Sequence, residues 1–412
     1  MRALKVIEGP FRLLFAARAA SALGDQLVPV ALSFAVLDLT GSVGDLGLVL
    51  GARTAALIVF VLIGGVWADR LSRKHVMLSA DAVRMLAQGA SAALLLGGAA
   101  RVWELVALQA AYGAAEGFFG PASIAIVPDT VPAAKLQEAN ALLGLTENAA
   151  AVLGPALAGV IVAVAGAGWG LAADGATFAV GIALLLPMRT GEAAAGGAAR
   201  ARAGMLTELR AGWHAFRARS WLWITVLFFT LYMGLVYAPY QVLGPQIART
   251  SLGGAGAWAA ISAALGVGAV GGGLIGLRWK PVHPLRATFL VFAVSGPALL
   301  LGLAVHAPLP ALLAVAFLDG AASSVFNALW FTAQHAEIPP GELSRVSSWD
   351  YLGTLVLSPA GLAVTGPIAL AIGFSATLYG AGALSFALTV AVLLVPAVRN
   401  FAPRARAGAA GQ

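Results

Sequence analysis

The sequence predicts an all-α membrane protein with twelve transmembrane helices in two pseudo-symmetric six-helix bundles. Three observations lead to this prediction. Of the 412 residues, 60% are hydrophobic and only 10% are charged, and the mean hydropathy of +0.89 excludes a soluble globular domain. Apolar runs of about 20 residues, the length that crosses a bilayer, recur along the chain. Most of the cations lie in every second loop between these runs.

The apolar runs are too long and alternate too weakly for the strands of a membrane barrel. Backbone inside a bilayer must satisfy its own hydrogen bonds, so we expect each run to be a helix. The expected spans are residues 12–38, 46–68, 76–99, 103–127, 138–164, 169–187, 221–247, 255–277, 286–305, 308–334, 345–371 and 373–396. They divide into an N-terminal bundle over 1–187 and a C-terminal bundle over 221–398, followed by a tail over 399–412.

A longer segment, residues 188–220, connects the two expected bundles. Its first part is rich in glycine and alanine, which is typical of a flexible linker. Its second part places Leu206, Leu209, Trp213 and Phe216 at helical spacing among charged residues. This pattern predicts an amphipathic helix on the inner membrane surface, and a linker without regular structure is the alternative.

The two halves of the sequence resemble each other when one is shifted by 207 residues. Pairs related by the shift are Gly113 and Gly320, Phe119 and Phe326, Pro132 and Pro339, Leu136 and Leu343, Gly154 and Gly361, and Gly159 and Gly366. Because the frame holds over two spans and a loop, we expect the two bundles to be structural repeats.

The cations predict the orientation of the chain in the membrane. With these spans, 20 of the 25 Lys and Arg residues lie on one side, two (Arg101 and Arg249) lie on the other, and three (Arg18, Arg53 and Arg84) lie within spans. Cationic loops stay in the cytoplasm, so both termini and the linker are expected inside the plasma membrane. The same placement accounts for the formal net charge of +7 without a nucleic-acid partner.

A short cationic turn, GGVWADRLSRK, connects the second and third expected spans. Its spacing, Gly65-x-x-x-Asp69-Arg70-x-x-Arg73-Lys74, resembles the loop signature of the major facilitator superfamily. The resemblance implies a cytoplasmic gate. In such a gate the glycine lets helices approach, the aspartate caps a helix end or pairs with a cation, and the cations lie at the lipid headgroups. An ordinary basic turn between two spans is the alternative.

Further motifs resemble the drug and macrolide efflux branch of that superfamily, which also includes siderophore exporters. They are Arg18-x-x-Ser21-x-Leu23-Gly24-Asp25, Leu39-Thr40-Gly41-Ser42, Pro128-Asp129-x-Val131-Pro132 and Ala139-Asn140-Ala141. In the fifth span, Gly154-Pro155-x-x-x-Gly159 resembles the signature of exporters. It implies a kinked, closely packed helix that helps to seal the cytoplasmic route.

The fourth span departs from the pattern of many proton antiporters. Those proteins carry a buried arginine four residues before a glycine, whereas here Gln109 precedes Gly113. The usual arginine-assisted proton step is therefore not predicted for this span.

Ionisable side chains inside the spans are the candidates for proton coupling, because a charge at the bilayer centre costs about 2.5–3.5 kcal/mol on insertion scales. The candidates are Asp25, Glu116 and Asp319 near the midplane, Glu147 nearer the cytoplasm, and Arg18. Arg18 and Asp25 lie two turns apart on one helix face, which suggests an internal ion pair or a shared water-lined face. Arg18 is the expected partner that alternates with a proton or a cationic substrate. Purely structural ion pairs are the alternative.

Other polar and aromatic residues receive separate expectations. Arg53, Arg84, Asp174 and Asp350 are expected nearer the membrane faces, where they reach the interface or pair at a gate. The residues expected to line the substrate cavity are Gln26, Tyr112, Phe119, Asn148, Tyr237, Tyr240, Phe326, Asn327 and Trp330. For the rings among them, packing in the core is the alternative.

The sequence carries no ATP-binding loop, no zinc-protease motif and no cysteine, so we expect neither an enzyme nor a cofactor or metal site. Energy is expected from an ion gradient. The sequence therefore predicts a bacterial, monomeric proton antiporter that exports amphipathic small molecules: drugs, macrolides, siderophores or secondary metabolites. A transporter-like sensor or interaction protein, and a nutrient importer, are the alternatives.

The orientation can be tested by cysteine labelling, because the chain has no native cysteine. A cysteine introduced at Ala195 in the linker should react with a membrane-impermeant thiol reagent only after the membrane is opened. Labelling of intact cells from outside would contradict the orientation.

Overall fold

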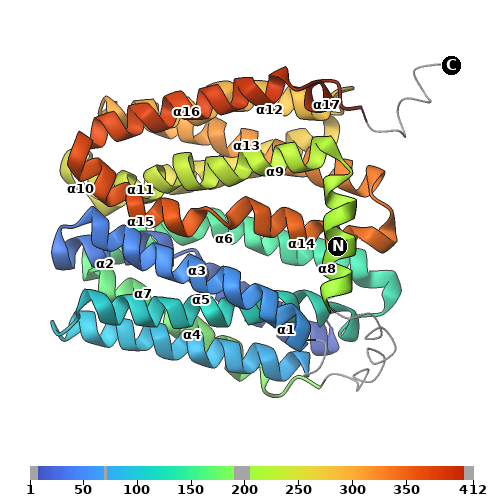
Figure 1. The fold of residues 1–412 in the computed structure, drawn as a ribbon. Helices are drawn as coiled ribbons and strands as arrows, with labels where there is room; N and C mark the ends of the chain where they lie inside the picture. Colours follow the sequence, from blue (N-terminus) through green and yellow to red (C-terminus); the bar gives the residue numbers. More distant parts are fainter. Residues whose placement is uncertain (1–7, 69–71, 190–204, 403–412) are drawn as a thin grey trace. The chain divides into compact units, whose positions relative to one another are not determined.

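The computed structural model describes residues 8–68, 72–189 and 205–402, and these residues are almost entirely helical (Figure 1). Within the described ranges no strand occurs. The expectation of an all-α membrane protein is confirmed.

The described residues form two compact units. The first unit comprises the residues up to 189 together with 248–263, and the second comprises 205–247 and 264–402. The helices before the linker are α1 (Gly9–Asp25), α2 (Val28–Thr40), α3 (Val43–Ala68), α4 (Arg73–Leu96), α5 (Val102–Ala125), the 3-10 turns η2 (Val127–Asp129) and η3 (Ala133–Lys135), α6 (Leu136–Ala165) and α7 (Ala167–Leu185).

The helices after the linker begin with α8 (Met205–Arg217). They continue with α9 (Ser220–Tyr232), the π-helical turn η5 (Met233–Tyr237), α10 (Ala238–Ser251), α11 (Ala255–Arg278), α12 (Pro284–Ala304), α13 (Leu309–Glu337), α14 (Pro340–Leu355), α15 (Ser358–Ile372), α16 (Phe374–Leu394) and α17 (Pro396–Arg399). The end of α10 and the start of α11 belong to the first unit.

Ten segments of the described chain are long and apolar enough to cross a membrane. The expected third and fourth spans correspond to α4 and α5, which are not among these ten although each has 24 residues. At about 1.5 Å per residue, a helix of that length exceeds the roughly 30 Å hydrocarbon core of a bilayer. Both helices are thus long enough to cross a membrane, but they are not among the ten segments that also meet the apolar criterion, so the count of twelve spans stays a prediction.

The first span of each half is interrupted, which the expected continuous runs did not show. In the first half, α1 ends at Asp25 and α2 begins shortly afterwards with Pro29 near its start. A proline lacks the N–H that a continuous helix needs at this point. In the second half, the π-helical turn η5 separates α9 from α10, and its first residue, Met233, is related to Gln26 by the shift of 207.

One tight turn has the same backbone conformation in both halves of the chain. Gly166 joins α6 to α7 with φ 95°, and Gly373 joins α15 to α16 with φ 94°. A side chain rarely tolerates these angles, so glycine is required at both positions. The two glycines are 207 residues apart, and the sequence repeat is thus also a repeat of local structure.

Glycines also set the close approach of helices in both units. The backbone of Gly113 in α5 lies directly against the carbonyl oxygen of Arg53 in α3. The related Gly320 in α13 lies against the carbonyl oxygen of Leu265 in α11. Small residues at such contacts let two helix backbones touch, so each pair of helices packs without intervening side chains.

The linker contains a helix, α8, where the amphipathic pattern predicts one. In Figure 1 this helix crosses beside the ends of α9 and α14. The Trp213 ring lies 5.0 Å from the Trp349 ring of α14, and Phe216 is buried. Arg219, just after α8, forms a 2.9 Å ion pair with Glu342. Part of the apolar face of α8 therefore packs on protein, and its position at the inner membrane surface stays a prediction.

The glycine contact between α11 and α13 can be tested by adding one methyl group. Gly320→Ala should destabilise the protein by about 1–3 kcal/mol, because the new Cβ would overlap the Leu265 carbonyl. The matched control is Gly380→Ala in α16, where nothing lies within 4 Å of the added Cβ. Thermal unfolding in detergent, followed by tryptophan fluorescence, should show a lower midpoint for Gly320→Ala only. Equal midpoints for the two variants would contradict the packing account.

Candidate functional site

A cavity of about 310 Å³ lies within the first unit. The residues that line it come from α1, the turn after α1, α5 and α6: Arg18, Ser21, Ala22, Asp25, Gln26, Glu116, Phe119 and Glu147. Three carboxyl groups, one guanidinium, one amide and one aromatic ring thus face the same space. The cavity gathers four of the five proton-coupling candidates of the sequence, Asp319 being the exception, and two of the expected substrate contacts, Gln26 and Phe119.

Arg18 pairs with Glu147 and not with Asp25. Its guanidinium donates to the Glu147 carboxylate across the space between α1 and α6, and also to the backbone oxygen of Ser123 at 3.4 Å. The expected pair between Arg18 and Asp25 is therefore wrong. Seven residues along a helix span about 10 Å, so Arg18 meets a carboxylate on a neighbouring helix more easily.

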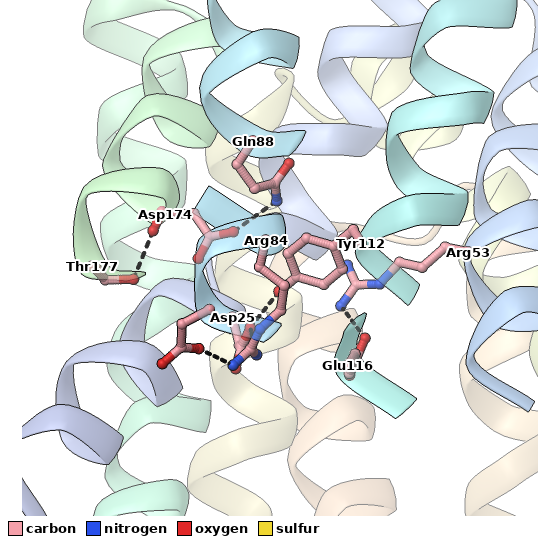
Figure 2. Close-up of polar contacts among 9 residues, drawn as sticks. Asp25, Arg53, Arg84, Gln88, Tyr112, Glu116, Asp174 and Thr177 are labelled. Atoms are coloured by element: carbon pink, nitrogen blue, oxygen red, sulfur yellow. Dashed lines mark hydrogen bonds and ion pairs between the residues drawn. The ribbon is translucent and has the colours of Figure 1, made fainter. Parts of the chain in front are cut away.

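Asp25 lies at the end of α1 and has two partners from other helices. The Tyr112 hydroxyl of α5 donates to its carboxylate, and the Arg84 guanidinium of α4 lies 3.6 Å from the same oxygen (Figure 2). Arg84 also pairs with Asp81, three residues earlier on α4, and both of these side chains are 1% exposed. One guanidinium is thus shared by two carboxyl groups.

Aromatic rings enclose the Arg84 guanidinium. Its central carbon lies 4.0 Å from the centre of the Phe119 ring and 4.4 Å from that of the Phe178 ring. A ring face attracts a cation, and the attraction is stronger away from water. Arg84, which was expected nearer a membrane face, where it reaches the interface or pairs at a gate, is paired with two acids in the interior of the unit. Its depth in the membrane stays a prediction.

Arg53 makes a second interior pair. Its guanidinium in α3 donates to Glu116 of α5 at 3.1 Å and lies 4.2 Å from the centre of the Tyr112 ring. The same tyrosine thus donates to Asp25 and stacks on Arg53, which links the two ion pairs (Figure 2). Of the two roles expected for Arg53, reaching the interface or pairing with an acid, the structure shows the pairing.

At Gln109, where the fourth span lacks the arginine, two buried amides and one carboxyl group form a chain of hydrogen bonds. Gln109 donates to Gln88 at 3.0 Å, and Gln88 donates to Asp174 of α7 at 2.7 Å. All three side chains are fully buried. Asp174, which was expected nearer a membrane face, is thus paired inside the unit, and its depth in the membrane stays a prediction. Asp174 also packs directly on Gly24, where a larger residue would displace the carboxylate.

The loop signature is described only in part, because Asp69 and Arg70 lie outside the described residues. Arg73 pairs with Asp129 at 2.8 Å and donates to the backbone oxygen of Ala125. Lys74 donates to the backbone oxygens of Leu186 and Met188, just after α7. Both cations thus bind C-terminal ends of helices, where the backbone carbonyls lack partners.

The GPxxxG segment of α6 lies at a close helix contact. Gly154 packs on the backbone of Gln26, in the break between α1 and α2, and Gly159 packs on Ala259 at the start of α11. Pro155 is buried within the helix, whereas Ala156 is exposed. The motif therefore positions α6 against the cavity turn that holds Gln26.

The remaining candidates belong mostly to the second unit. Phe326 and Trp330 are buried and stack at 5.8 Å, and the Trp330 indole donates to Asp350 at 3.1 Å. The rings of Tyr237 and Tyr240 stack at 5.7 Å. Asn148 in the first unit and Asn327 in the second are exposed. The described contacts of these rings are those of an aromatic core.

Sequence reasoning missed two members of the network, Asp81 and Gln88. A signal was present, because Asp81-Ala-Val-Arg84 puts two opposite charges three residues apart inside an apolar run. Gln88 lies one turn after Arg84 on the same face. The spacing alone did not show that these side chains meet Asp25 and Asp174.

The arrangement leaves an excess of acid in the first unit, four of the acids inside it and Glu147 partly exposed at the edge of the cavity. Five carboxyl groups (Asp25, Asp81, Glu116, Glu147 and Asp174) lie with three guanidinium groups (Arg18, Arg53 and Arg84). A carboxylate away from water needs a compensating charge or a proton. The network can therefore take up positive charge, either as protons or as a cationic group in the cavity.

Comparison with known proteins agrees with this picture. The model of the Major Facilitator Superfamily matches residues 14–302. The multidrug efflux pump Tap of Mycolicibacterium fortuitum is 26% identical over 419 residues and 97% of each chain is covered. The enterobactin exporter EntS of Escherichia coli O127:H6 is 29% identical over 405 residues, which cover 93% of this chain and 92% of EntS.

Solved structures show the same fold. The nucleoside transporter NupG superposes with a TM-score of 0.72 at 13% identity, covering 94% of this chain and 98% of NupG. The inward-open xylose transporter XylE from E. coli superposes with a TM-score of 0.67 at 12% identity, covering 93% of this chain and 95% of XylE. From its apolar helices, its loop signature and the family match, we conclude that this chain is a membrane transporter and belongs to the Major Facilitator Superfamily.

Proposed function

We propose that this chain exports amphipathic small molecules across the plasma membrane in exchange for protons. The observation that carries the proposal is the cavity of the first unit, where three carboxyl groups and one arginine lie beside Phe119 and Gln26. An aromatic ring suits the apolar part of a substrate, and the charges suit both a polar part and protons. The efflux names of Tap and EntS, each matched over nearly the whole chain, support export over import.

Asp25 is the first proposed proton carrier. It lines the cavity, and its partners Tyr112 and Arg84 come from different helices. When Arg84 is near, the carboxylate form is favoured, and when the contact opens, desolvation favours the protonated form. Arg84 keeps Asp81 as a partner, so losing Asp25 does not leave its charge unpaired. A movement between α1 and α4 is thus linked to loading or release of a proton.

Glu147 is the second proposed carrier, and Arg18 is its partner. Their ion pair connects α1 to α6 at the edge of the cavity, and the Glu147 side chain is 55% exposed. A proton on Glu147, or a cationic group of the substrate, would compete with Arg18 for the same oxygens. Since α6 also holds the Gly154 contact, opening this pair frees the helix that carries the exporter motif.

Export requires that proton and substrate favour different conformations. A ligand shifts a conformational equilibrium only by its difference in affinity for the two states. The ion pairs between α1, α4 and α6 exist in the described conformation, so protonation of their acids weakens this state. We infer that proton binding and substrate binding alternate, which is the basis of antiport.

The proposed function can be tested with the purified protein in liposomes. A pH gradient should drive accumulation of one class among cationic dyes, macrolides and siderophores, with matching proton movement reported by an entrapped pH indicator. Substrate movement without proton movement would contradict antiport. A protein that binds a compound but moves none of them would favour the sensor alternative.

The carriers can be tested by two isosteric substitutions. Asp25→Asn and Glu147→Gln should keep substrate binding and lose gradient-driven accumulation, because an amide keeps the shape of the side chain but does not titrate. The matched control is Glu138→Gln on the exposed start of α6, which should accumulate substrate like the parent. Uphill transport by both variants with the parent's pH dependence would make these acids structural.

The exporter motif can be tested by introducing larger side chains. Gly154→Leu and Pro155→Leu should abolish export or make the protein leak, since both positions are buried and Gly154 touches the backbone of Gln26. Ala156→Leu is the control on the exposed face of the same turn. Export rates and proton leak are measured in the same liposomes. Equal losses at all three positions would indicate general damage to packing.

A further inference from the structure

Asp319 in the second unit differs from the other midplane candidates. One of its carboxyl oxygens is buried and has no hydrogen-bond partner among the described residues. The ion pairs of the described chain do not include it. Asp25, Glu116 and Glu147 all face an arginine, whereas Asp319 faces none within the described ranges. An ionised Asp319 would therefore have no arginine beside it, among the described residues, to compensate its negative charge.

The repeat relates this acid to the Asp25 site. A shift of 207 residues places Tyr232 at the position of Asp25, and Asp319 at the position of Tyr112. In the first unit the tyrosine hydroxyl of α5 donates to the aspartate of α1. In the second unit the aspartate is on α13 and the tyrosine on α9. The same two residue types occupy both places, with their helices exchanged.

Polar groups converge on this position from several helices. Ser295 of α12 faces the Asp319 carboxyl, and the hydroxyl oxygens of Ser295 and Ser385 are buried without a hydrogen-bond partner among the described residues. At Gly296, an added Cβ would lie 3.1 Å from the Ser385 hydroxyl and 3.5 Å from the Tyr232 hydroxyl. Hydroxyl groups that lack partners in an apolar bundle leave hydrogen bonds for a polar occupant.

No cation of the described chain lies among these groups. The titratable side chains that interact with Asp319 are tyrosines: Tyr232 of α9, Tyr237 of η5 and Tyr240 of α10. α11 packs on α13 where Leu265 meets Gly320. Its arginine, Arg278, is its last residue, about 20 Å further along the helix at 1.5 Å per residue. A tyrosine hydroxyl donates a hydrogen bond but does not neutralise a carboxylate.

We propose that Asp319 is a second proton-binding site, separate from the cavity, which holds a proton in the described conformation and releases it during transport. The proposal deepens the proton antiport proposed above and rests on it. The proton arrives from water and binds a carboxyl oxygen of Asp319, and it leaves to water when the second unit changes conformation. The Asp319 residue is half-buried, and one of its carboxyl oxygens is fully buried.

The two sites would then use different chemistry. At Asp25 a proton competes with Arg84 for the carboxylate. The carboxyl group therefore gains a proton when it loses the arginine contact, and it regains the arginine contact when the proton leaves. At Asp319 there is no competing cation in the described part of the chain, and release of the proton leaves a charge that hydroxyl groups and water can hydrogen-bond but that no cation neutralises. Release from Asp319 is thereby linked to hydration of the second unit.

Infrared spectroscopy of the purified protein tests proton binding without any transport. A protonated carboxyl group gives a carbonyl stretching band that the ionised form lacks. We expect such a band at neutral pH, lost in Asp319→Asn and retained in Asp25→Asn. Glu138→Gln, at the exposed start of α6, serves as the control and should leave the band unchanged. If the spectrum of Asp319→Asn equals that of the parent, the proposal is wrong.

A second variant guards against loss of folding in Asp319→Asn. Ser295→Ala removes a neighbouring hydroxyl and leaves the carboxyl group in place, so the same band should persist. Loss of the band in a folded Ser295→Ala protein, where Asp319 is intact, would show that it does not report Asp319 and would overturn the proposal.

The transport role needs a second measurement. In liposomes, the number of protons exchanged per substrate, taken from the gradient at which net flux stops, should fall by one in Asp319→Asn. A band that depends on Asp319 with an unchanged ratio would mean a permanently protonated acid, which contradicts the proposal. If the parent protein itself moves no protons, the antiport proposal fails, while the infrared result still decides whether Asp319 binds one.

Discussion

The cost of placing charge away from water governs the first unit. Five carboxyl groups and three arginines lie in or behind one cavity wall, and each arginine contacts at least one acid. Removing one member of a buried pair leaves an uncompensated charge, which is far more costly than losing a surface pair. The ion pairs therefore fix how α1, α3, α4, α5 and α6 meet. The same pairs make the position of these helices sensitive to protons.

The polar network explains why α4 and α5 differ from the other long helices. They provide Asp81, Arg84, Gln88, Gln109 and Glu116, and their apolar character is correspondingly lower. These side chains point into the unit, where partners on α1, α3 and α7 satisfy them. A helix whose polar groups are paired inside a bundle can lie in a membrane that would exclude the isolated helix. Hydropathy alone underestimates such helices.

The two halves share a backbone design and differ in their chemistry. Gly113 and Gly320 make matching contacts, and Gly166 and Gly373 adopt the same turn. The interior of the first unit holds ion pairs, while the second holds an aromatic core around Phe326 and an acid without a cationic partner in the described ranges, Asp319. The repeated helix contacts thus preserve the fold in both halves, while the interior side chains of the two units differ.

The sequence by itself determined the fold class, the family, the approximate limits of the helices and the repeat. These depend on length, apolar composition and glycine spacing, which act locally along the chain. It also identified Asp25, Glu116, Glu147 and Arg18 as embedded charges, because charges inside apolar runs are visible in one dimension.

Only the tertiary structure decided which charges meet. Arg18 pairs with Glu147 and Arg84 with Asp25, residues separated by 129 positions and by 59 positions along the chain. Long guanidinium side chains reach several directions from one helix, so the rotation and approach of neighbouring helices select the partner. Those rotations depend on all the contacts of the bundle together, and they give Arg53, Arg84 and Asp174 polar partners inside the unit that the linear sequence did not show.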